Sequence, residues 1–225
     1  MDLDIAAAPH PRVERDGALA AIGVGGRDPP DMEGRLSETP MMPEIMDLEA
    51  TLLGPLVSGR ECGDCTACCE ALKIETPDFR KPAGTACPHL SAHGCAIHAA
   101  RPDVCRTWFC GWRRIKTLPN GARPDLSGLM VSLDFNREPR NCLEGISIMI
   151  RSLAGRTAFE SDMAERILDA LCDQLVPVWL NDGARKVLVH PESDVAHYVI
   201  SGETPPAELS EEVAAWSSRY GMFRP

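Results

Sequence analysis

Eight of the ten cysteines in this 225-residue chain lie between residues 62 and 110, and this cluster limits the fold more than any other feature. They are Cys62, Cys65, Cys68, Cys69, Cys87, Cys95, Cys105 and Cys110. Thiolates at two-residue spacing can turn several sulfurs toward one point, as a zinc ion or an iron–sulfur cluster requires. Because Cys68 and Cys69 are neighbours, their side chains diverge, and we expect at most one of them to join any given metal centre.

The order of these cysteines and the residues around them resemble a known family. The matching segments are Cys62-Gly-Asp-Cys65-Thr-Ala-Cys68-Cys69, Cys87-Pro-His-Leu90, Gly94-Cys95-Ala-Ile97-His98, Arg101-Pro-Asp-Val-Cys105-Arg106 and Cys110. Over residues 60–112 the chain is similar to the zinc- or iron-chelating cysteine-cluster family, also called the YkgJ-like cysteine cluster proteins. The resemblance implies metal binding, without a reaction common to the members. His98 stands where members usually carry tyrosine, so it is either a ligand or an aromatic substitute.

The start of the sequence and its apolar patterning indicate a reducing compartment. Residues 1–9 have no basic stretch and no continuous apolar core, so we expect no secretory signal and a cytoplasmic location. Clustered cysteines are there more often metal ligands or redox groups than disulfides. No apolar run approaches the roughly 18 residues of a membrane helix, so no membrane partner is expected.

Charge is unevenly distributed along the chain. The net charge of −10 divides into −7 over residues 1–59, +3 over residues 60–140 and −6 over residues 141–225. Basic side chains near the cysteines would stabilise the negative charge of a four-thiolate centre. For the basic residues of 113–116 we expect a solvated face instead. The acidic chain as a whole disfavours a nucleic-acid partner.

The sequence divides into three expected segments of an α+β protein. Residues 1–42 lack periodicity and predict a disordered tail. Residues 43–124 contain a leading helix, ending near Leu53, and the cysteine-cluster metal-binding module that this helix is expected to cover. Residues 125–225 predict an α+β portion packed on the module. The expected architecture is therefore a loop-rich metal module followed by a small, mainly antiparallel sheet with packed helices.

Local patterns predict the elements of the C-terminal portion. Residues 129–135 and 145–150 are apolar and β-branched, and they predict adjacent antiparallel strands. Ser161 is a candidate N-cap of a helix on which Cys172 is expected to be a buried core thiol. Further strands and a closing helix are predicted at residues 186–190, 197–200 and 206–220.

A short helix is also predicted in the second half of the cysteine cluster. Pro102 suits the first position of a helix, which we expect to carry Cys105, Trp108 and Phe109. Helical geometry does not bring Cys105 and Cys110 together. Five helical steps of about 100° each leave their side chains about 140° apart around the helix axis. Trp108, Phe109 and the following Trp112 are interpreted as an apolar cover for the metal site.

The identity of the metal and the number of centres stay open at this point. Cys62, Cys65 and Cys68 with a remote Cys87 followed by Pro88 match the spacing of bacterial ferredoxins, which favours a four-iron cluster. Eight thiols with a Cys-Cys pair also fit two four-coordinate zinc sites.

Other chemical groups give weaker indications. His89, His93 and His98 could complete a mixed cysteine and histidine sphere, although each is more simply a neighbour of the site or a surface residue. A nucleophilic cysteine needs a paired base, and no such pair is evident. Neither a phosphate loop nor a dinucleotide fingerprint is present. Enzymatic activity is therefore neither indicated nor excluded.

These observations predict a metal-binding cysteine-cluster protein that holds an iron–sulfur cluster or zinc through its eight clustered thiols. Its expected role is in redox chemistry or in maintaining an enzyme, with a protein partner docking on the acidic C-terminal portion. The alternative is a zinc-stabilised interaction or metal-handling module without catalysis. Structural zinc contributes about 10 kcal/mol or more, enough to hold a loop-rich region together.

Overall fold

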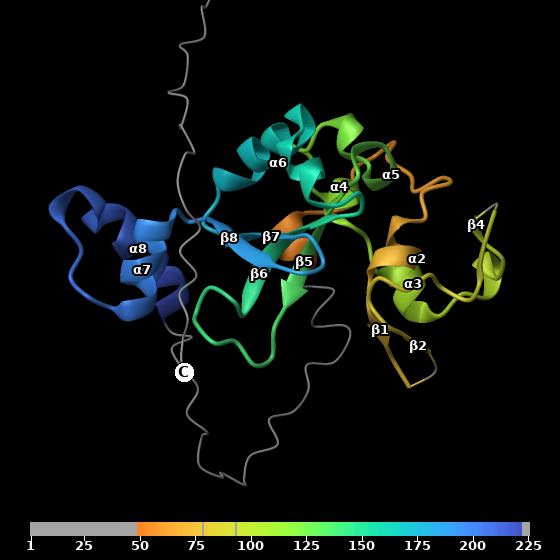
Figure 1. Cartoon of the computed structure of the whole chain (residues 1–225), viewed down its shortest axis with the longest axis horizontal. Helices are drawn as coiled ribbons and strands as arrows, with labels where there is room; N and C mark the ends of the chain where they lie inside the picture. Colours follow the sequence, from red (N-terminus) through yellow and green to blue (C-terminus); the bar gives the residue numbers. More distant parts are fainter. Residues whose placement is uncertain (1–48, 78, 93, 222–225) are drawn as a thin grey trace, which may run out of the picture. The chain divides into compact units, whose positions relative to one another are not determined.

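The computed structural model describes residues 49–77, 79–92 and 94–221, which all belong to one compact unit (Figure 1). The expected tail at residues 1–42 lies outside the described residues, as do residues 43–48 of the leading helix. The fold class is α+β, as predicted, with short helices and small sheets. Within the described ranges, no helix is both long and apolar enough to cross a bilayer.

A four-stranded sheet forms the framework of the C-terminal part. Its strands, in spatial order, are β5 (Leu129–Phe135), β6 (Ile146–Ser152), β7 (Val178–Asn181) and β8 (Lys186–His190). β5 and β6 are antiparallel, with Val131 opposite Ile150, and β7 and β8 are antiparallel as well. β6 and β7 are parallel. The prediction of a mainly antiparallel sheet is confirmed, while β7 is not among the expected strands.

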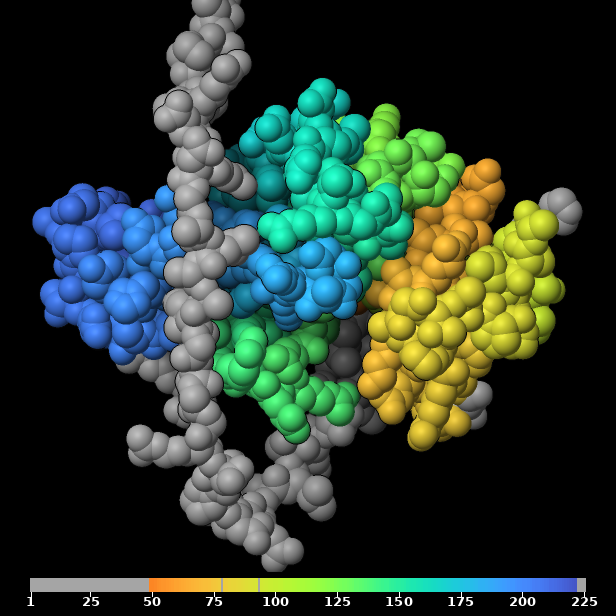
Figure 2. Space-filling view, viewed as in Figure 1, coloured from red at the N-terminus to blue at the C-terminus, as the bar shows by residue number. Residues whose placement is uncertain are grey.

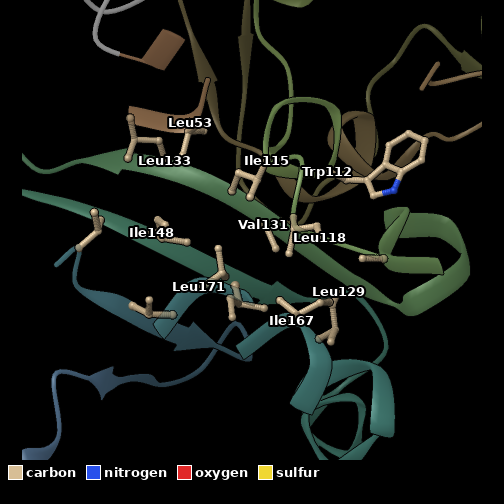
Figure 3. Close-up of a cluster of buried hydrophobic side chains, with 14 of the residues drawn as sticks. Leu53, Trp112, Ile115, Leu118, Leu129, Val131, Leu133, Ile148, Ile167 and Leu171 are labelled. Carbon is tan, nitrogen blue, oxygen red and sulfur yellow. The ribbon is translucent and has the colours of Figure 1, made fainter. Parts of the chain in front are cut away.

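The main hydrophobic core lies on one face of this sheet. Side chains of β5 and β6 meet Ile167 and Leu171 of helix α6 (Asp162–Cys172), as Figure 3 shows. Ser161 caps α6 as predicted, because its side chain accepts a hydrogen bond from the Ala164 N–H at 3.2 Å. Consecutive residues of both strands are buried, which explains their continuous apolar sequences.

Several short elements surround this core. They are α4 (Gly111–Arg114), α5 (Pro124–Ser127) and the 3-10 helices η2 (Asn120–Ala122) and η3 (Arg156–Glu160). Residues 49–53 are helical, and Leu53 packs into the same core. The described residues of the leading helix therefore pack on the sheet core, and for them the expectation that the helix covers the cysteine cluster is wrong.

A second cluster of buried side chains is built by the C-terminal helices. These are α7 (Ser193–Ser201), η4 (Ala207–Leu209) and α8 (Ser210–Tyr220), which pack around Trp216 and Leu143. The strand predicted at residues 197–200 is wrong, because this segment belongs to α7. The buried residues Val195, Ala196 and Val199 follow helical spacing, and the left-handed Gly202 ends the helix. This tertiary burial overrides the β-branched character of the segment.

The basic residues of 113–116 do not form a single solvated face. Arg114 is 7% exposed and lies 3.7 Å from the carboxylate of Glu49, while it donates a hydrogen bond to the Gly54 carbonyl. Arg113 lies over the ring of Phe109, and Lys116 is exposed. The solvated-face expectation is therefore wrong for Arg114, because α4 turns this side chain toward the residues that precede the cysteine cluster.

The cysteine segment, defined as residues 61–110, consists of turns and very short elements. These are α2 (Ala67–Ala71), β1 (Ile74–Glu75), β2 (Arg80–Lys81), β3 (Leu90–Ser91), β4 (Gly94–Cys95), η1 (His98–Ala100) and α3 (Asp103–Thr107). Helix α3 carries Cys105 as predicted, but it ends at Thr107, so Trp108 and Phe109 lie beyond it. Pro102 is its N-cap residue and not its first helical residue.

Burial in the cysteine segment is unlike that in the rest of the chain. Among its described residues, Ala67 and Lys81 alone are buried. In Figure 2 the yellow part of the chain, which includes the β3–β4 hairpin, lies at the surface. The described residues of the segment therefore form no hydrophobic core of their own.

Candidate metal-binding site

The clustered cysteines border one cavity, which we call the cysteine cavity. Its volume is about 230 Å³. Seven of the eight predicted ligands line it: Cys62, Cys65, Cys68, Cys69, Cys87, Cys95 and Cys105. Phe79, Trp108 and Phe109 also line it, which agrees with the expected aromatic cover for the last two. The same expectation is wrong for Trp112, which is buried in the main core. The fold thus gathers thiols that are up to 43 positions apart in the sequence, from Cys62 to Cys105.

Tight backbone turns place the first four cysteines. The Cys65 N–H donates to the Cys62 carbonyl at 3.0 Å, and the Cys69 N–H donates to the Thr66 carbonyl at 2.8 Å. Cys68 and Cys69 both lie in helix α2, so their side chains leave the helix about 100° apart. The two neighbouring thiols can therefore bind metal on different sides of the cavity.

The later cysteines return to the first group through backbone hydrogen bonds. The Cys87 N–H donates to the Cys69 carbonyl at 2.9 Å, which joins the two halves of the cluster. The β3–β4 hairpin places Cys95 opposite Leu90. Cys105 follows on α3, one residue after Val104, which also lines the cavity.

We divide the eight thiols into two sets according to which thiols raise the pKa of one another. The first set comprises Cys62, Cys65, Cys68 and Cys110. Burial, acting with the nearby thiols of Cys62 and Cys65, raises the pKa of Cys110 to about 11. The pKa of Cys68 is raised first by the hydrogen bond between Cys68 and Cys69, then by burial, and further by Cys62 and Cys65. These four thiols therefore lie close enough to influence one another's ionisation.

The remaining four thiols, Cys69, Cys87, Cys95 and Cys105, form a second set. The pKa of Cys105 is raised first by burial and then by the nearby thiols of Cys69, Cys87 and Cys95. The pKa of Cys69 is lowered, chiefly because Cys68 shares a hydrogen bond with it. The neighbouring pair Cys68 and Cys69 thus supplies one thiol to each set.

The side chains border the cavity without converging on a single point. In the part of the chain that the structure describes, no group of three or more His, Cys, Asp or Glu side chains is arranged to hold a metal ion. The chemistry of the donors nevertheless fits zinc or an iron–sulfur cluster, because both take thiolate ligands in groups of four. Rotation of the cysteine side chains toward the cavity would be needed to complete a coordination sphere.

The other predicted groups occupy different positions. His89 and His98 line the cysteine cavity, and His98 contacts the guanidinium of Arg101, whereas His93 lies outside the described residues. Cys142 is 3% exposed and its thiol lies 3.9 Å from the Val199 carbonyl in the second core. Cys172 ends α6 and is half-buried, so the expectation of a buried core thiol is wrong.

Cys110 lies at the junction of the cysteine segment and the sheet. Its side chain packs against the main core, and Gly111 follows it at the start of α4. A Cβ atom at Gly111 would come within 2.7 Å of the Val131 side chain on β5. The missing side chain at Gly111 therefore lets α4 approach the sheet and fixes the position of Cys110.

Two functional candidates are not evident from the sequence. Lys81 is the buried cation of the cysteine segment, and Asp125 shares a hydrogen bond with the thiol of Cys65. Lys81 lies in a polar stretch of the sequence, where a lysine is ordinarily exposed. Its burial becomes evident only in the structure, where the residues after it fold back onto α2. Asp125 lies on α5, outside the cluster, and no local pattern connects it with Cys65.

Comparison with known proteins adds nothing to these residues. No family model, curated protein or solved structure matches the chain. The proposed function therefore depends on the cysteines and on the cavity that they line.

Proposed function

We propose that the cysteine segment binds metal through its two sets of four thiolates, and that the bound metal takes the place of a hydrophobic core. The observation that carries this proposal is the gathering of seven cysteines around one cavity in a segment that buries only Ala67 and Lys81 among its described residues. Such a segment gains little from apolar burial, whereas structural metal binding can contribute about 10 kcal/mol or more.

The grouping of the thiols supports two centres. Zinc is usually held by four ligands, and the two sets supply four thiols each. In the first set Cys110 is the fourth thiol, with Cys62 and Cys65 near it, whereas the ferredoxin-like spacing would instead take Cys87 as the fourth ligand. This arrangement keeps iron–sulfur ligation open as well, because a cluster can take its fourth cysteine from a remote segment.

The chemistry that follows depends on the metal. An iron–sulfur cluster supplies electron transfer, and the role would then be redox chemistry or the maintenance of a partner enzyme. Zinc with four thiolates leaves no open coordination position, and the role would then be a stabilised surface for protein interaction or metal handling. In both cases the cysteine side chains hold the metal, and Trp108 and Phe109 limit access of water to the cavity.

Elemental analysis and visible spectroscopy of protein purified under anaerobic, reducing conditions test the proposal. We expect either about two zinc ions per chain and no colour, or iron and inorganic sulfide with a brown colour. The double variant Cys142→Ser/Cys172→Ser is the matched control, and it should retain the wild-type metal content. Wild-type protein that contains no metal and binds none when zinc or iron with sulfide is supplied would overturn the proposal.

A further inference from the structure

Lys81 is a buried charged residue in the cysteine segment. Its side chain is 2% exposed, and it is the only charged side chain buried among the described residues between 61 and 110. Its ammonium donates hydrogen bonds to three backbone carbonyls, those of Thr85 at 2.7 Å and of Glu70 and Pro82 at 3.3 Å. The ammonium is therefore held in a fixed place.

No carboxylate balances this charge among the described residues, since none forms an ion pair with Lys81. A buried charge without a counter-charge is strongly destabilising, because backbone carbonyls replace only part of its hydration. The adjacent Arg80, in contrast, is exposed. The burial of Lys81 thus calls for a negative group close by.

The nearby anionic candidates are thiols, three of them from the second set and one, Cys68, from the first. Lys81 bonds to the carbonyls of Glu70 and Thr85, which stand next to the backbone segments that carry Cys69 and Cys87. Those two segments are joined by the Cys87 N–H to Cys69 carbonyl hydrogen bond. Burial lowers the pKa of Lys81, and the thiols of Cys87, Cys69, Cys68 and Cys105 act in the opposite direction.

We propose that Lys81 is the built-in counter-charge of the metal centre formed by Cys69, Cys87, Cys95 and Cys105, so that this centre is held as an anion by four thiolates. The inference rests on the proposed function. A divalent ion with four thiolates has a net negative charge, and a fixed ammonium in a site of low dielectric stabilises it. Lys81 is thus a positioning residue that selects an all-thiolate centre over a neutral one.

A purely structural role would make a different prediction. If Lys81 only ties three carbonyls together, a neutral hydrogen-bond donor of similar length would replace it, and a bulkier cation would not. If its charge matters, arginine replaces it and glutamine does not. Lys81→Arg and Lys81→Gln therefore separate the two roles, and Arg80→Gln removes the same charge from the exposed neighbour on β2.

Cobalt(II) titration of the metal-free, reduced protein provides the test, with thiolate-to-cobalt absorption as the signal and a chelator in competition. We expect wild type, Arg80→Gln and Lys81→Arg to bind two ions with similar affinity. Lys81→Gln should bind one of the two ions about 10–100-fold more weakly, as loss of an outer partner of a metal site usually causes. The other ion, held by the first set, should bind as in wild type.

The outcomes separate this inference from the proposed function. Equal affinities of Lys81→Gln and wild type for both ions would overturn the counter-charge role while metal binding stands. Equal losses in Lys81→Gln and Lys81→Arg would overturn it too, because charge would then not matter. If Lys81→Gln binds neither ion because the segment fails to fold, recovery of both ions in Lys81→Arg supports the role, and no recovery overturns it. Wild type that binds no cobalt would overturn the counter-charge role, whereas the proposed function is overturned only if the protein also binds neither zinc nor iron with sulfide.

Discussion

The cysteine segment differs from the residues that follow it, 111–221, in what its interior is made of. We call residues 111–221 the sheet part. Among the described residues, every buried hydrophobic side chain except Leu53 and Ala67 lies at or beyond residue 112. The later residues fold around an apolar core, each fully buried side chain of which contributes about 1.5–3 kcal/mol. The cysteine segment gathers thiols and one lysine at its centre instead. The difference shows that the two parts need different sources of stabilisation.

The two parts differ in their local structure as well. The sheet contains seven-residue strands, and α6 extends over eleven residues. Helices and strands of the cysteine segment are at most five residues long, too short to be stable without tertiary support. The two parts meet where Arg60 donates hydrogen bonds to the carbonyls of Trp112, Ile115 and Leu118, at 2.6, 3.0 and 2.6 Å. Cys110, at the other end of the segment, packs against the main core, so the later residues support the segment at both of its ends.

Replacement of metal-binding cysteines should have the largest effect on stability, and this effect should be confined to the cysteine segment. Replacing Cys62, Cys65, Cys87 or Cys105 by serine should remove the metal of the set to which that cysteine belongs and destabilise the cysteine segment, because structural metal binding contributes an apparent free energy of about 10 kcal/mol. Limited proteolysis should then cleave between residues 61 and 110, while the fluorescence of the buried Trp216 stays unchanged. Metal content that is unchanged in all four variants would contradict the assignment of these ligands.

A cavity in the apolar core should lower the stability of residues 111–221 by a smaller amount. Leu171 is 1% exposed and packs against the sheet from α6, so Leu171→Ala should lower the free energy of unfolding by about 2–5 kcal/mol. Chemical denaturation measured by tryptophan fluorescence gives this value. The amount of metal bound per chain should remain that of wild type. Loss of metal in this variant would show that the two parts are not independently stabilised.

Acid should weaken the sheet part through Glu144. Burial acts to raise the pKa of this carboxylate, but the hydrogen bonds and charge of Arg140 outweigh it and lower the pKa below 4.5. Because the folded pKa lies below the unfolded one, the stabilisation is present above about pH 4.5 and is lost as the pH falls through the folded pKa.

Glu144→Gln should therefore cost about 1–2 kcal/mol at neutral pH, since the partner Arg140 is exposed and water screens part of the interaction. The difference from wild type should shrink in acid, as denaturation curves at several pH values would show. A constant difference at all pH values would mean that the charge of Glu144 contributes nothing.

Sequence alone predicted the parts of the fold that depend on local pattern. The strands β5 and β6 and the capped helix α6 have long apolar runs or clear boundary residues, so their prediction was correct. β7 has only four residues, and α7 contains a β-branched run whose helical state depends on burial against α8. These two elements are set by tertiary contacts that no local pattern contains.

The candidate site divides in the same way. All eight cysteines could be named from spacing, because metal sites need donors in dense groups. Their division into two sets could not, since only the folded chain brings Cys110 near Cys62 and Cys65. The role of Lys81 was hidden as well, because it arises only when residues 82–87 fold back onto α2.

Hydrogen exchange measured with and without a metal chelator shows whether metal stabilises the cysteine segment. We expect metal removal to abolish amide protection in this segment, for example at Cys69 and Cys87, while β5 and β6 keep their protection. Equal protection of residues 61–110 in the metal-bound and metal-free protein would contradict it, because the segment would then be stable without metal.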